Sequence, residues 1–180
     1  MALVAMIMSG WRIYNASPLF GFSFPVWATL GGWLGGAIAW HFAAMWLLVV
    51  NGMIYAITGL IGGRFRRELL PIHADEVARD FSAALHLRLH HDGRRYNSVQ
   101  RLFYLGVLLL GVLAVLTGLA LWKPVQMQVI GDLVGGYEVV RRLHFIAMSG
   151  ICAFIVVHLA LVVLVPRTLI SIIFGRRTVS

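Results

Sequence analysis

The sequence has little charge, and this scarcity excludes an ordinary soluble domain. Only 12% of the 180 residues are charged, whereas soluble domains hold about a quarter. Hydrophobic residues make up 60% of the chain, and one small core cannot bury that much apolar surface. Because each span needs about 20 apolar residues, the length predicts an all-α transmembrane four-helix bundle with one sizeable loop. We expect a single membrane-embedded domain over residues 1–180.

Cysteine and lysine are almost absent as well. Cys152 is the only cysteine, which excludes an internal disulfide and a cluster ligated by several cysteines. Lys123 is the only lysine, so the net charge of +8 comes almost entirely from arginine. These arginines lie beside apolar segments, a pattern that indicates membrane topology rather than nucleic-acid binding.

Three apolar stretches have the length and the terminal breakers of membrane-spanning helices. They run over Ala37–Ile61, Leu102–Trp122 and Leu143–Val165. The start of the chain differs, because Met1–Met8 provides only eight apolar residues before Ser9 and Gly10. We interpret the sequence as beginning inside the first transmembrane helix, and we expect the reading frame to continue upstream.

Arginine is concentrated in the stretch 62–101 and in the C-terminal tail. By the positive-inside rule, this basic loop and both termini face the cytoplasm of a multi-pass protein in the bacterial inner membrane. The connections Trp11–Gly36 and Lys123–Arg142 then lie on the periplasmic side. Apolar residues recur at helical spacing from Val77 to Leu89, which predicts a short amphipathic helix on the lipid headgroups.

The seven histidines fall into two groups by position. Four lie in the basic loop, where solvent or headgroups would surround them: His73, His86, His90 and His91. The other three lie inside apolar spans: His41, His144 and His158. A titratable ring within a span is costly and indicates function. For any one of them alone, a structural hydrogen bond to a neighbouring helix is an equal alternative.

The spacing of the three span histidines favours haem ligation. His144 and His158 are fourteen residues apart, which separates them by about 21 Å along one helix and by only about 40° around it. His41 lies about one turn into a span that enters from outside, as does His144, so the two share a depth on different helices. A bis-histidine haem requires two imidazoles at one depth. His158 lacks such a partner in any span, and we expect that partner upstream of Met1.

These features give the chain a resemblance to the prokaryotic di-haem b-type cytochrome family. This family includes the cytochrome b subunits of nickel–iron hydrogenases and formate dehydrogenases, and small partners of periplasmic molybdopterin enzymes. The resemblance covers essentially all 180 residues. Its most specific element is the pair His144 and His158 with His41. In addition, Ser9–Pro18 (SGWRIYNASP) resembles the family's first periplasmic turn, and Tyr96–Arg101 (YNSVQR) its entry to the third helix.

The resemblance implies four helices, two haem b groups and electron transfer in a respiratory chain, between quinone and an external redox enzyme. By that pattern His41 and His144 ligate the outer haem, while His158 ligates the inner haem with a first-helix histidine. That last ligand is absent from this sequence, so the residues at hand support one haem fully.

Five further residues are candidates for secondary sites. Arg141 and Arg142 could pair with haem propionates or simply anchor the helix end. Tyr96, Asn97 and Gln100 could hydrogen-bond a quinone, with polar capping of the third helix as the alternative.

Two other functions stay open at this point. One is a stand-alone quinone-linked oxidoreductase of the superoxide oxidase type, and the other is a haem-free membrane anchor. The sequence has no pterin, flavin or cluster motif, so the redox chemistry would belong to the bound cofactor. An electron-transfer subunit is therefore favoured over a self-contained enzyme.

Overall fold

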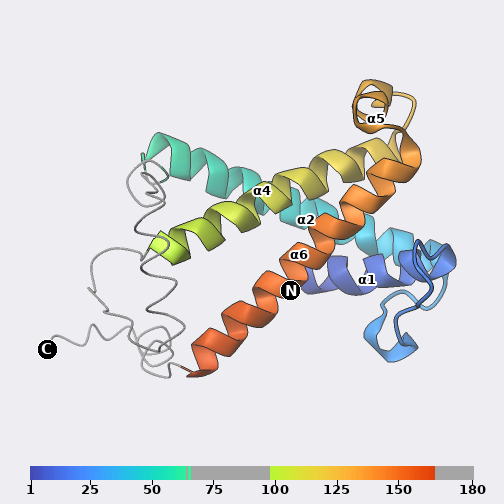
Figure 1. Cartoon of the computed structure of the whole chain (residues 1–180), viewed down its shortest axis with the longest axis horizontal. Coiled ribbons are helices and arrows are strands. Elements are labelled where there is room, and N and C mark those ends of the chain that lie inside the picture. Colours follow the sequence, from blue (N-terminus) through green and yellow to red (C-terminus); the bar gives the residue numbers. More distant parts are fainter. Residues whose placement is uncertain (64, 66–97, 165–180) are drawn as a thin grey trace, which may run out of the picture. The chain divides into compact units, whose positions relative to one another are not determined.

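The computed structural model describes residues 1–63, 65 and 98–164, and the described part contains helices and no strand. The elements in chain order are α1 (Ala2–Ala16), the 3₁₀ turn η1 (Val26–Ala28), α2 (Leu34–Ile61), α4 (Ser98–Trp122), α5 (Gln128–Val134) and α6 (Tyr137–Leu164) (Figure 1). The predicted all-α membrane fold is therefore confirmed. The amphipathic helix, the loop histidines and the arginine-rich tail lie outside the described residues.

Three helices are long and apolar enough to cross a membrane, over Leu34–Ile61, Gln100–Trp122 and Tyr137–Val162. They correspond to the three predicted spans, but all of them start earlier than predicted. The helical backbone begins before the apolar core, at Leu34 on α2, at Ser98 on α4 and at Tyr137 on α6. Tyrosine suits the membrane interface. The helix α1 has 15 residues, fewer than the roughly 20 that a span needs.

The described chain divides into two compact units, Met1–Leu102 and Phe103 onward. The single-domain organisation thus stays a prediction. In the first unit α1 packs along α2, as Figure 1 shows for the blue and cyan helices. Small side chains allow this approach, because Ala37 and Ala44 of α2 are buried together with Ser9 of α1. The helix α1 ends at Ala16, since Pro18 disfavours a helical conformation of the preceding Ser17, whose φ and ψ are −151° and 79°.

An aromatic loop joins α1 to α2. Asn15 holds it twice: its side-chain amide donates to the carbonyl oxygen of Phe24 at 2.8 Å and accepts from the Phe24 backbone N–H at 2.8 Å. The ring of Phe24 stacks on Trp11 with centroids 4.6 Å apart, and Tyr14 contacts both Phe22 and Phe24. These contacts hold the loop against the last turns of α1.

In the second unit the short helix α5 connects α4 to α6 (Figure 1). The chain reverses at Gly135 and Gly136, whose φ angles of 102° and 97° favour glycine. Small side chains are buried on both long helices, namely Thr117 and Ala120 on α4 and Val140 and Ala147 on α6. Because these side chains are small, side chains of α4 can contact those of α6.

Candidate functional site

His41 is held by a hydroxyl group from the neighbouring helix. It is the eighth residue of α2, which has 28 residues. Its ring Nδ1 lies 3.0 Å from Oγ of Ser9 on α1, and Ser9 is completely buried. The contact joins two residues that are 32 positions apart in the sequence.

The hydrogen-bond direction at this contact follows from the other partners of Ser9. The Ser9 hydroxyl donates to the backbone carbonyl oxygen of Ala5, with the Met6 carbonyl oxygen 3.2 Å away. A carbonyl oxygen only accepts, and a hydroxyl has a single proton. The His41 Nδ1–H therefore donates to Oγ of Ser9. In this tautomer Nε2 carries the lone pair that a metal ligand needs.

His144 has the same arrangement in the second unit. It is also the eighth residue of a 28-residue helix, α6. Its Nδ1 lies 2.9 Å from Oγ1 of Thr117 on α4, and Thr117 is only 4% exposed. The Thr117 hydroxyl donates to the Leu113 carbonyl oxygen at 2.6 Å, so by the same reasoning the His144 Nδ1–H donates to Thr117.

A glycine follows the hydroxyl residue in both places, and each glycine lies against the imidazole ring. A Cβ atom on Gly10 would lie 3.4 Å from Cε1 of His41, and one on Gly118 would lie 3.2 Å from Cε1 of His144. Glycine costs about 1 kcal/mol relative to alanine inside a helix. At these two positions it lets the ring approach the backbone of the adjacent helix.

Each of these two histidines, taken by itself, has the chemistry of a haem-iron ligand. Two neutral imidazoles, each with Nδ1–H engaged, present Nε2 as the ligand atom, and a second-shell partner on the other nitrogen is the usual arrangement for a metal-binding histidine. Within the described ranges, no group of three or more His, Cys, Asp or Glu residues could hold a metal ion. Haem needs only two protein ligands, because its porphyrin supplies the other four.

His158 lies in different surroundings. It is on the same continuous helix as His144, so the predicted separation of about 21 Å along that helix holds. Its ring is exposed and stacks on Phe154 with centroids 5.7 Å apart and planes 15° apart. Phe154 in turn contacts Tyr104 of α4 at 6.4 Å.

The predicted secondary-site residues are placed as follows. Arg141 forms an ion pair with Glu138 at 3.1 Å, and Arg142 is exposed one position further along α6. Gln100 lies exposed in the first turn of α4, whereas Tyr96 and Asn97 lie outside the described residues.

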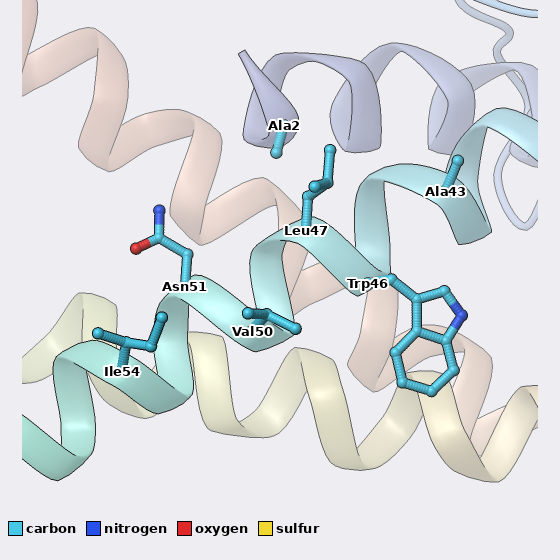
Figure 2. Close-up of a pocket in the computed structure, with 7 residues that line it drawn as sticks. All are labelled: Ala2, Ala43, Trp46, Leu47, Val50, Asn51 and Ile54. Atoms are coloured by element: carbon cyan, nitrogen blue, oxygen red, sulfur yellow. The ribbon is translucent and has the colours of Figure 1, made fainter.

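An open apolar groove of about 510 Å³ lies between the start of α1 and one face of α2. Figure 2 shows its lining: Ala2 of α1, with Ala43, Trp46, Leu47, Val50, Asn51 and Ile54 of α2. Asn51 provides an amide and Trp46 an indole N–H, and none of the span histidines lines the groove. It is therefore separate from the histidine sites.

Sequence reasoning found the histidines but missed Ser9 and Thr117. A signal for them exists, because each is followed by glycine inside an apolar helix that precedes a histidine-bearing span. The same dipeptide also occurs at Thr58 and Gly59, where the described structure shows no ring contact with histidine, so the pattern alone does not identify a partner.

Comparisons with known proteins identify the family of this chain. Residues 1–175 match the family model described as prokaryotic cytochrome b561. A protein of Azospira oryzae named "Putative protein-methionine-sulfoxide reductase subunit YedZ1" is 51% identical over 175 residues, which cover 97% of this chain and 88% of the relative. No solved structure matches. The chain therefore belongs to the prokaryotic cytochrome b561 family and is a membrane b-type cytochrome that passes electrons to a redox enzyme.

Proposed function

We propose that this cytochrome carries electrons between the quinone pool and a periplasmic oxidoreductase, with His41 and His144 as the axial ligands of one haem b. The observation that carries the proposal is the shared environment of the two histidines. Each is the eighth residue of a long apolar helix, and each donates its Nδ1–H to a buried hydroxyl. Each imidazole thereby leaves Nε2 unprotonated and able to bind iron, at the same position of its helix.

The residues of the chain would act in three ways. His41 and His144 would bind the iron through Nε2, while Ser9 and Thr117 hold the rings. Haem, when bound, supplies reversible one-electron chemistry. Arg141 and Arg142, one turn before His144, would pair with the haem propionates. The ion pair between Arg141 and Glu138 is partly exposed, and such pairs are weak enough for Arg141 to exchange partners.

A second haem and a quinone site belong to the same proposal. His158 would ligate the inner haem, about 21 Å further along α6, with Phe154 stacked against its ring. Tyr96, Asn97 and Gln100 would hydrogen-bond quinone near that haem. Entry of α4 at Ser98 places Gln100 in its first turn, which is compatible with this role.

The identity of the relative supports a reductase as the partner. That protein is named as a subunit of a protein-methionine-sulfoxide reductase. Reduction of a sulfoxide to a thioether and water consumes two electrons and two protons, so the enzyme needs an external electron donor. We infer that this chain supplies electrons to a periplasmic oxidoreductase with a molybdopterin or metal-cluster centre. The relative's description as a subunit favours this function over a stand-alone superoxide oxidase.

The ligand assignment is tested with His41→Ala and His144→Ala in the purified protein. Each variant should lose the same low-spin haem or convert it to high spin, because an axial position is opened. Haem content is measured as the pyridine haemochrome, and spin state by EPR. His73→Ala, a change in the basic loop, is the control and should leave both unchanged. An unaltered low-spin spectrum in both span variants would show that these histidines do not ligate the iron.

The electron route is tested separately by adding the oxidised partner enzyme to the quinol-reduced cytochrome. Reoxidation of the haem within the assay, dependent on the partner, is expected. The stand-alone enzyme would instead be supported if the haem were reoxidised equally fast without the partner and if the cytochrome transferred electrons from superoxide to quinone.

A further inference from the structure

We propose that Ser9 and Thr117 are positioning residues that fix the tautomer and raise the basicity of His41 and His144. The proposal rests on the proposed function, since it assumes that these histidines ligate iron. It adds two residues, on α1 and α4, that never contact the iron themselves.

Each of the two histidines begins a chain of two hydrogen bonds. At Thr117 the chain runs from Nδ1–H of His144 to Oγ1 at 2.9 Å, and from that hydroxyl to the Leu113 carbonyl oxygen at 2.6 Å. Ser9 links His41 to the Ala5 carbonyl oxygen in the same order. Consecutive hydrogen bonds polarise one another, most strongly in surroundings of low dielectric. Each imidazole therefore donates into an already polarised acceptor.

Thr58 provides a comparison for Ser9 and Thr117, because its hydroxyl also lies on an apolar helix. Thr58 on α2 makes the same backbone bond, donating to the Ile54 carbonyl oxygen at 2.8 Å, yet it is exposed and has no histidine contact in the described structure. A hydroxyl in an apolar helix is thus satisfied by its own backbone. The contact with a histidine ring is an additional feature, and it occurs at Ser9 and Thr117, which are both buried.

The hydrogen bond at Nδ1 changes how strongly Nε2 binds a metal. A partner that accepts the Nδ1–H bond raises the basicity of Nε2, and losing such a partner typically costs 10- to 100-fold in metal affinity. A more basic imidazole stabilises the oxidised iron more than the reduced iron. Removing the hydroxyl should therefore weaken the oxidised form and shift the midpoint potential to more positive values. A tenfold loss confined to the oxidised form corresponds to about 59 mV for one electron.

The experiment compares Thr117→Val with Thr117→Ser in the purified holoprotein. Valine keeps the shape and removes the hydroxyl, whereas serine keeps the hydroxyl and loses the methyl group. Ser9→Ala removes the second hydroxyl, and Thr58→Val is the matched control on α2. Midpoint potentials are measured by optical redox titration, and the low-spin g values by EPR.

The expected result is a positive shift in Thr117→Val and Ser9→Ala, with values near wild type in Thr117→Ser and Thr58→Val. If Thr117→Val loses its haem while Thr117→Ser keeps it, the hydroxyl is still shown to be required. Equal potentials and g values in Thr117→Val, Thr117→Ser and wild type would overturn the proposal. The same variants also distinguish the positioning role of the hydroxyls from the pairing of His41 with His144. If Ser9→Ala and Thr117→Val shift different haems, the pairing of His41 with His144 fails while the positioning role stands.

Discussion

Replacing Gly118 by alanine places a methyl group against the ring of His144. The added Cβ would lie 3.2 Å from Cε1 of that ring, which is closer than ordinary van der Waals contact, and 3.7 Å from Nδ1. The ring must retreat by a few tenths of an ångström, and its 2.9 Å hydrogen bond to Thr117 should be distorted. We therefore expect weaker haem binding in Gly118→Ala.

The magnitude follows from two opposing effects. Overpacking a tight contact costs about 1–3 kcal/mol, whereas alanine gains about 1 kcal/mol over glycine within a helix. Gly111→Ala on the same helix isolates the second effect, because nothing lies within 4 Å of a Cβ added there. Gly118→Ala should be less stable than Gly111→Ala by about 1–3 kcal/mol. At about 2–4 °C for each kcal/mol in a chain of this size, the two melting temperatures should differ measurably.

The assay is loss of the Soret absorbance during heating of the purified protein, together with EPR of the low-spin haem. Gly10→Ala provides a graded comparison, since its Cβ would lie 3.4 Å from Cε1 of His41, an ordinary contact. It should resemble Gly111→Ala more than Gly118→Ala. Identical melting temperatures and g values for Gly118→Ala and Gly111→Ala would refute the claim that the ring lies tightly against this glycine.

Asn15→Ala removes both hydrogen bonds to the backbone of Phe24 and should destabilise the first unit by about 1–3 kcal/mol, measured as a lower melting temperature; an unchanged value would show that the loop is held by its aromatic contacts alone. His158→Ala should lower the haem count without altering the spectrum of the haem that needs His41 and His144, and loss of both signals would contradict separate sites. A reporter that is active only in the cytoplasm should be active when it is fused after Ser180, given the arginines of the loop and tail. Activity of a reporter that works only in the periplasm would reverse the predicted topology.

Helix positions were predictable because apolar length is a local property of the chain. The three spans could be recognised by counting residues, but their starts at Leu34, Ser98 and Tyr137 could not. Residues such as Trp33 or Tyr137 suit either a helix end or a loop at the interface, and the choice depends on what packs against them. The sequence likewise gave no sign that Asn15 would hold Phe24 from nine positions away.

The sequence by itself determined that this is an all-helical membrane protein with three imidazoles at costly positions. The spacing of His144 and His158 set their common face, since both lie on one helix and helical geometry is fixed. Only the tertiary structure decided that Ser9 meets His41 and Thr117 meets His144, across 32 and 27 residues of chain. The rotation of one helix about its axis relative to its neighbour is not encoded in either helix alone. It depends on which small residues let the two backbones approach, and here those residues include the glycines that follow each hydroxyl.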